Sequence, residues 1–159
     1  SIAAVSNIET SKVLERVEAI IEDLRNKEKE IENLKNEIIT YRIDNALKKA
    51  IEKDGVKIVS IFVENTKADD LRKMTDIIRS KTKNCIALVG TKDETKGMFV
   101  VAVSKEIQNS YNAGRIVKKI SEKYKGRGGG SPQIAQGGVP SEVLTEAIKD
   151  IEIILNSHL

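Results

Sequence analysis

The residues best suited to ligand chemistry lie between Lys125 and Pro140, a stretch that holds six of the ten glycines and both prolines of the sequence. Backbone N–H groups without flanking side chains can approach a phosphate closely, and Arg127 adds a positive charge. The stretch lacks the common nucleotide fingerprints, because a Ser-Pro dipeptide follows Gly130 and because the whole stretch follows a helical pattern. We therefore expect an ordered, functional loop here, with a flexible linker as the alternative.

A basic pattern leads into this stretch. Between Asn112, a candidate helix cap, and Arg127 there are six bases and one acid, Glu122. Lys and Arg side chains neutralise phosphates, and Tyr111 or Tyr124 could stack on exposed RNA bases. A solvated helix face is the alternative interpretation of the bases, and an ordinary core aromatic is the alternative for Tyr124. The candidate RNA-binding residues are Arg115, Lys118, Lys119, Lys123, Lys125, Arg127, Gly128, Gly129, Gly130 and Gln133.

The residues that enzymes use for catalysis are scarce. His158 is the only histidine, and Cys85, the only cysteine, stands in an apolar run, so neither a nucleophile with its base nor a metal site can be assembled. The carboxylates Asp69 and Asp70 stand at an expected helix start, where negative charge interacts favourably with the helix dipole and stabilises the helix. We expect no catalytic residue, no metal ligand and no cofactor in this chain, which is then not an enzyme by itself.

The composition describes an aliphatic, charged chain of 159 residues, with 32% charged side chains, 3% aromatic side chains and a net charge of +3. That length fits one domain with an appendage. No apolar run approaches the roughly 18 residues of a membrane span, no signal peptide stands out, and the lone cysteine favours a cytoplasmic location. The chain starts with Ser1 and enters a helical pattern at once, so we expect a segment of a longer protein.

The first 54 residues contain neither Gly nor Pro and repeat apolar residues at heptad spacing. A helix from about residue 8 to about residue 52 would extend roughly 65 Å and needs a partner to cover its apolar stripe. We expect a second copy of the chain to be that partner; a hairpin that folds back near Asn26 and Lys27 is the alternative. The expected dimerisation residues are Val13, Val17, Ile20, Leu24, Ile31, Leu34, Ile38 and Tyr41.

The remaining residues alternate between strand and helix patterns. Gly55 is expected to end the long helix, Thr66 to cap the next helix in a capping box with Asp69, and Ser141 to cap the last helix. The apolar run at 85–89 is expected to be a central strand, antiparallel to the strand after it. The expected fold class is α/β: a helical stalk at 1–54, then a compact mixed-sheet unit at 55–159, in the order α-β-α-β-β-α-loop-α. The expected strands are 56–63, 85–89 and 98–103.

The run from Gly126 to Gly138, GRGGGSPQIAQGG, resembles the signature of the DHHA1 family, in which a Gly-Arg-Gly-Gly-Gly run leads to Ala-Gln-Gly-Gly. Residues 100–105 look like the strand before the family's basic helix, and the resemblance covers roughly residues 55–157. The family occurs at the C-terminal end of alanyl-tRNA synthetases and in DHH phosphoesterases. The heptad-patterned stalk is similar to the synthetase arrangement, and the Asp-His-His motif of the phosphoesterases does not occur in this sequence.

The resemblance implies the C-terminal domain of an alanyl-tRNA synthetase, an ATP-dependent alanine–tRNA ligase. Such a domain is implied to contact the elbow of tRNA, with tRNA-Ala as the expected partner, and to support aminoacylation and editing by domains absent here. The resemblance also implies a homodimer, no membrane partner, and ATP and zinc sites only in those absent domains. Two alternatives stay open: the substrate-binding domain of a DHH-family phosphoesterase, and a dimerisation module without RNA binding.

Overall fold

The computed structural model describes residues 2–158, and the chain divides into two compact units, Ser1–Tyr41 and Arg42–Leu159. The division at residues 54 and 55 that the sequence suggests stays a prediction. Helix α1 (Ile2–Lys48) is continuous, so the hairpin alternative for the stalk is wrong: Asn26 and Lys27 lie inside the helix. The helix ends before residue 52, and its last turns, from residue 42, belong to the second unit. Within 2–158, every helix is too short or too polar to cross a membrane.

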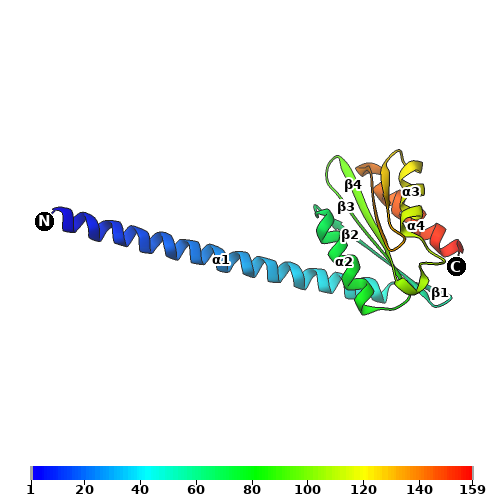
Figure 1. The fold of residues 1–159 in the computed structure, drawn as a ribbon, viewed down its shortest axis with the longest axis horizontal. Coiled ribbons are helices and arrows are strands. Elements are labelled where there is room, and N and C mark those ends of the chain that lie inside the picture. The colour runs from blue at the N-terminus through cyan, green and yellow to red at the C-terminus, as the bar shows by residue number, and fades with distance from the viewer. Residues whose placement is uncertain (1, 159) are drawn as a thin grey trace. The chain divides into compact units, whose positions relative to one another are not determined.

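The second unit is built on one six-stranded mixed sheet, which confirms the expected α/β class (Figure 1). The strand order is β1-β2-β3-β4-β6-β5; β2 and β3 are parallel, and every other neighbouring pair is antiparallel. The strands are β1 (Ile51–Lys53), β2 (Val56–Glu64), β3 (Cys85–Lys92), β4 (Lys96–Val103), β5 (Arg127–Gly130) and β6 (Ile134–Pro140). The helical segments are α2 (Ala68–Lys81), η1 (Lys105–Ile107), α3 (Ala113–Lys123), η2 (Ser141–Val143) and α4 (Leu144–His158).

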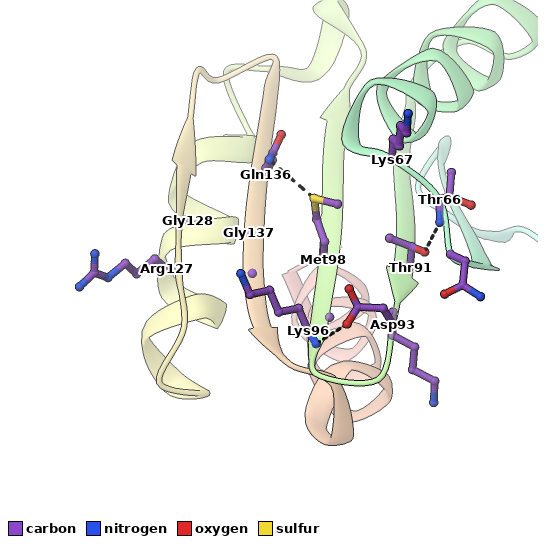
Figure 2. Close-up of a pocket in the computed structure, with 14 residues that line it drawn as sticks. Thr66, Lys67, Thr91, Asp93, Lys96, Met98, Arg127, Gly128, Gln136 and Gly137 are labelled. Carbon is purple, nitrogen blue, oxygen red and sulfur yellow. Dashed lines mark hydrogen bonds between the residues drawn. The ribbon is translucent and has the colours of Figure 1, made fainter.

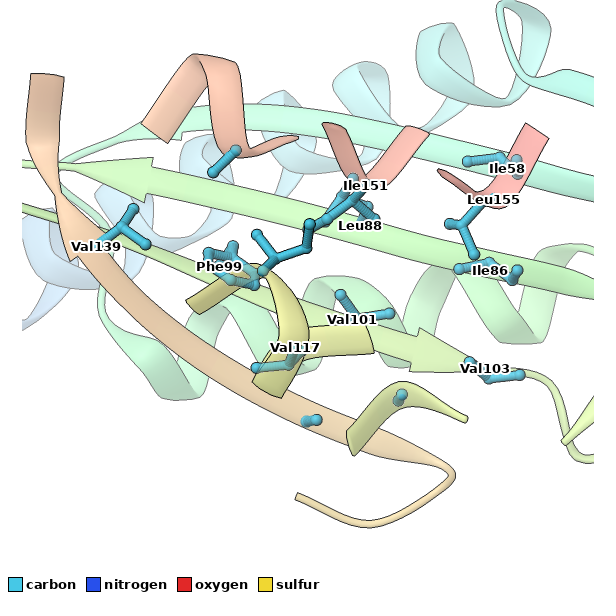
Figure 3. Packing of buried hydrophobic residues seen from close by; sticks show 14 of the residues in the cluster. Ile58, Ile86, Leu88, Phe99, Val101, Val103, Val117, Val139, Ile151 and Leu155 are labelled. Carbon is cyan, nitrogen blue, oxygen red and sulfur yellow. The ribbon is translucent and has the colours of Figure 1, made fainter. Parts of the chain in front are cut away.

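Helices cover the sheet from both sides. Helix α2, the crossover between parallel β2 and β3, packs on β3 and β4 from one side, while α3 and α4 lie on the other side (Figure 1). On the α3 and α4 side, Leu88 and Phe99 of the sheet meet Val117 of α3 and Ile151 of α4 in the main apolar cluster (Figure 3). Each fully buried side chain of this size contributes about 1.5–3 kcal/mol to folding. The sheet is therefore the rigid support for whatever its loops and edges bind.

The central strand confirms its sequence-based expectation. Residues 85–91 of β3 are all buried, as expected for an apolar run in the middle of a sheet, and β4 pairs with it antiparallel. Cys85 is a free, buried thiol whose pKa is raised by burial. Its Sγ lies 3.3 Å from the Ser104 hydroxyl, so it is a packed side chain and not an exposed nucleophile.

The glycine-rich stretch corrects the expected element order. It is not a loop but two antiparallel strands, β5 and β6, at the edge of the sheet. Glycine is poor at forming strands on its own, but here it allows β5 and β6 to pack closely against α3. A Cβ on Gly128 would lie 2.6 Å from Cγ1 of Val117. The packing against the helix, and not local propensity, makes these residues strands.

Three expected helix boundaries are also corrected. Gly55 does not end α1: with Asp54 it forms the β1–β2 turn, and both residues have positive φ (79° for Gly55 and 53° for Asp54), as a two-residue type I′ hairpin turn requires.

Thr66 does not cap α2, whose N-cap is Lys67; the Thr66 hydroxyl donates to the Glu64 carbonyl instead. Ser141 begins the short helix η2 before α4. Only the Asn112 cap of α3 is confirmed, since its side chain accepts from the Arg115 N–H at 3.1 Å.

Candidate nucleic-acid interface

The two faces of the β5–β6 hairpin differ. Gly128 pairs with Gly137, and a Cβ on either residue would point toward α3. Because side chains alternate along a strand, the residues before and after each of these glycines face the opposite side of the sheet, the side of α2. These residues form two cross-strand pairs, Arg127 with Gly138 and Gly129 with Gln136. We call the α2 side of the hairpin, carrying Gly129, Gln136 and Gly138, the open glycine face.

The glycines divide into two classes by what a Cβ would meet. A Cβ on Gly137 would lie 2.5 Å from the Ser121 hydroxyl oxygen, so packing against α3 requires glycine at this position. In contrast, a Cβ on Gly129 would meet nothing within 4 Å, and one on Gly138 would meet only the Gly97 carbonyl at 3.7 Å, an ordinary contact. Internal packing therefore gives no reason for glycine on the open glycine face. Close approach of an outside molecule is a reason that remains.

A cavity of about 550 Å³ adjoins the open glycine face (Figure 2). It lies between the start of α2, the β3–β4 turn and the β5–β6 hairpin. Figure 2 shows Lys67 at the start of α2, Lys96 at the start of β4 and Arg127 projecting from the β5 edge. The residues that line it are Asn65, Thr66, Lys67, Thr91, Lys92, Asp93, Lys96, Gly97, Met98, Arg127, Gly128, Gln136, Gly137 and Gly138.

Positive charge dominates this cavity. Four lining side chains are bases, and Asp93 is the single acid among those that line it. The carboxylate of Asp93 accepts from the backbone N–H groups of Lys96 at 2.7 Å and Thr95 at 2.8 Å, and these bonds, that of Lys96 first, lower the pKa of Asp93. The acid therefore holds the β3–β4 turn together. Among these bases, the ammonium of Lys92 lies 5.7 Å from the centroid of the Phe62 ring, and Arg127 projects from the β5 edge (Figure 2). Phosphate oxygens would be favourable ligands for the bases of this region.

The structure divides the expected RNA-binding residues between the two sides of the sheet. Arg127 and Gly128 line the cavity, and Gly129 lies on the open glycine face beside it. The bases of α3 lie on the opposite side, where Arg115 and Lys119 line a second cavity of about 440 Å³ with Tyr111. The remaining expected residues, which line neither cavity, are Lys118, Lys123, Lys125, Gly130 and Gln133.

One base of α3 is already engaged within the fold. The ammonium of Lys123 lies 2.7 Å from a carboxylate oxygen of Asp150 on α4, and the Tyr124 hydroxyl donates to the same oxygen. Hydrogen bonds from Lys123 and then Tyr124 lower the pKa of Asp150, and the bond to Asp150 raises the pKa of Tyr124 to about 12. The half-buried Tyr124 thus ties α3 to α4. Because its ammonium is paired with Asp150, Lys123 is less available to bind a phosphate than the other bases of α3 are.

Sequence reasoning missed Lys67, Lys96 and Gln136. Their positions are set by the β2–α2–β3 crossover and the β3–β4 turn, which bring residues about thirty to seventy positions apart into one cavity. The alternation of buried and half-buried residues along Ile134–Pro140, which places Gln136 on one face of β6, is visible only in the folded chain. Among residues 2–158, no cluster of His, Cys, Asp and Glu is arranged to hold a metal ion.

Comparison with known proteins gives a family and two kinds of structural relative. The DHHA1 domain family matches residues 54–157. An alanine–tRNA ligase of Natranaerobius thermophilus is 33% identical over 160 residues, a match that covers 99% of this chain and 18% of that ligase. The chain therefore spans about a fifth of the length of such curated relatives.

Among solved structures, the C-Ala domain from Aquifex aeolicus alanyl-tRNA synthetase is similar, with a TM-score of 0.61 and 29% identity over 67% of this chain and 96% of that one. PggH, a pGpG-specific phosphodiesterase from Vibrio, has a TM-score of 0.50 and 14% identity over 77% of this chain and 39% of its own. That second likeness shows a shared fold and nothing more.

Proposed function

Because the chain belongs to the DHHA1 family and matches the C-terminal region of alanine–tRNA ligases, we propose that it is the tRNA-binding and dimerisation domain of such a ligase. The observation that carries the tRNA part is the open glycine face, where Gly129 and Gly138 leave the backbone uncovered beside a basic cavity. Backbone without side chains admits the close approach of a sugar or base, and the bases supply phosphate contacts.

In this proposal the elbow of tRNA, with tRNA-Ala as the natural partner, lies against the open glycine face. Arg127 contacts a phosphate at the β5 edge, and Lys67 and Lys96 extend the positive charge into the cavity. Docking the elbow would position the acceptor end for aminoacylation and editing in the domains outside this chain. ATP and zinc would belong to those domains, and the whole ligase would work in the cytoplasm.

The dimerisation part rests on α1. All eight residues of its expected seam are exposed, with relative exposures from 45% for Val17 to 68% for Tyr41. An apolar stripe at heptad spacing on a 47-residue helix is buried most simply by a second copy of the same helix. We therefore propose a homodimer joined through α1.

The test is the binding of this chain to folded tRNA across a salt series, with a short single-stranded RNA and a dinucleotide measured alongside. We expect tRNA to bind most tightly and log K to fall linearly with log salt concentration, with a slope of about −0.7 to −0.9 per phosphate contact. The double variant Arg127→Ala, Gly129→Ala is expected to weaken this binding. Absence of tRNA binding at low salt would refute the proposal. Tighter binding of the dinucleotide would favour a phosphoesterase substrate domain instead.

A further inference from the structure

A second guanidinium approaches the open glycine face, from helix α2. Arg72 donates from Nε and Nη2 to the side-chain oxygen of Gln136, at 3.3 Å and 3.1 Å. The amide nitrogen of Gln136 lies 3.7 Å from the sulfur of Met98 on β4. These contacts fix the orientation of the amide, because the flipped amide would set its NH₂ against the donors of the guanidinium. Gln136 therefore holds Arg72 in place over β6.

The charge of Arg72 is not used within the fold. The side chain is exposed, and among residues 2–158 no carboxylate lies within ion-pair distance of it. Its neighbours on α2 differ in this respect, since Lys73 lies 3.9 Å from Asp70 and Arg79 is paired with Asp76. A guanidinium has five N–H donors, and Gln136 uses two of those of Arg72. The others are free for an anion.

The strand register places the two arginines on opposite sides of the open glycine face. Gln136, which holds Arg72, pairs with Gly129, and Arg127 pairs with Gly138 two positions along the hairpin, in the next pair on the same face. Arg72 thus comes from the α2 side and Arg127 from the β5 edge, with the side-chain-free positions between them. An extended phosphodiester backbone carries anions at regular intervals, which suits two separated guanidiniums.

We propose that Arg72 is a second phosphate-binding residue of the tRNA site and that Gln136 is its positioning residue. This inference rests on the proposed function, and it deepens that function by giving the RNA a path: one phosphate at Arg127, one at Arg72, and the nucleoside between them against the glycine backbone. A neutral amide suits the positioning role, because it orients the guanidinium while leaving its charge for the ligand. A carboxylate at position 136 would orient and neutralise it at once.

The experiment is a fluorescence-anisotropy titration of tRNA with the full chain over a salt series, for wild type, Arg72→Ala, Gln136→Glu and Lys73→Ala. Lys73→Ala is the matched control, since it removes the same charge from the adjacent residue of α2. We expect Arg72→Ala to bind roughly tenfold more weakly at low salt and to lower the salt slope by about one. Gln136→Glu should reproduce both effects without a fall in Tm, and Lys73→Ala should reproduce neither.

The outcomes separate this inference from the proposal on which it rests. If the wild-type chain binds tRNA and Arg72→Ala binds with the same affinity and slope, Arg72 is not a binding residue. Equal losses in Arg72→Ala and Lys73→Ala would also overturn the inference, since they would show a general effect of charge on α2. A wild-type chain that fails to bind tRNA overturns the proposed function itself.

Discussion

A glycine can be required by its own fold or by a molecule that approaches it, and the β5–β6 hairpin contains both kinds. Gly128 faces α3, where a Cβ would lie 2.6 Å from the Ser121 hydroxyl oxygen and from Cγ1 of Val117. Gly129, the next residue, faces open space. The sequence alone does not distinguish the roles of these two glycines. Their surroundings do: Gly128 is required by packing against α3, and Gly129 is open to an approaching ligand.

Two alanine variants separate these roles. Gly128→Ala is expected to destabilise the fold by about 1–3 kcal/mol, because the added methyl group overpacks the contact with α3. Gly129→Ala should leave stability unchanged or raise it by up to about 1 kcal/mol, since alanine loses less conformational freedom on folding, while weakening tRNA binding. Denaturant unfolding of both variants, followed by a tRNA titration of the stable one, checks this. A stable Gly129→Ala chain with full tRNA affinity would contradict a ligand role for this position.

Between elements, the contact of α3 with α4 predicts a pH dependence. The Tyr124 hydroxyl donates to Asp150, which raises the pKa of Tyr124 from 10.0 to about 12. Because the folded-state pKa is raised, the stabilisation is complete below pH 10 and is lost as the pH rises through about 12. The pKa of Asp150 is lowered from 3.8, chiefly by Lys123, so its contribution is present above that value and is lost as the pH falls below it.

The measurement is an ultraviolet titration of the tyrosines in wild type and in Asp150→Asn. We expect the variant to lose the highest-pH transition, because Tyr124 then ionises closer to its ordinary pKa of 10.0. Tyr124→Phe identifies that transition by removing it. If Asp150→Asn leaves the highest-pH transition in place, the hydrogen bond does not control Tyr124.

The helices and strands differ in how well the sequence alone predicts them. The apolar run at 85–89 and the Asn112 cap determine their elements locally, so β3 and the start of α3 were predicted. Strands β5 and β6 were not, because glycine has no strand preference of its own and their pairing depends on the contact with Val117 across the chain. The local residue pattern predicts a strand where consecutive residues are buried, as in β3. It does not predict a strand that forms through contact with a helix distant in sequence, as in β5 and β6.

The candidate site shows the same limit. The motif identified Arg127 and its glycines, because those residues are consecutive. Arg72 lies on α2 and Lys67 directly before it. Arg72 reaches the hairpin, and Lys67 the cavity beside it, only because β2 and β3 are parallel and the crossover helix returns over the sheet. Their side chains carry no local sign of this, since an exposed base on a helix resembles any solvated residue. Such residues could be found only after the topology was known.

For the whole molecule, the proposed functions are carried by different segments of the chain. The expected seam of α1 lies in unit Ser1–Tyr41, and every residue we assign to tRNA binding lies in unit Arg42–Leu159. The second unit contains the complete sheet and its apolar cluster, so its fold does not depend on the seam. Dimerisation and tRNA binding should therefore be separable by substitution.

The double variant Leu24→Gln, Ile31→Gln is the test of that separation. Glutamine keeps helix propensity and net charge but cannot bury its amide in a coiled-coil seam without cost, so we expect a monomer where wild type is a dimer. Analytical ultracentrifugation should show half the wild-type mass, and the control Arg25→Gln, Glu32→Gln should keep the dimer. The salt slope for tRNA should be the same in both variants, because the phosphate contacts lie outside α1. A monomer with a lower slope would instead place phosphate-binding residues in α1 or across the dimer.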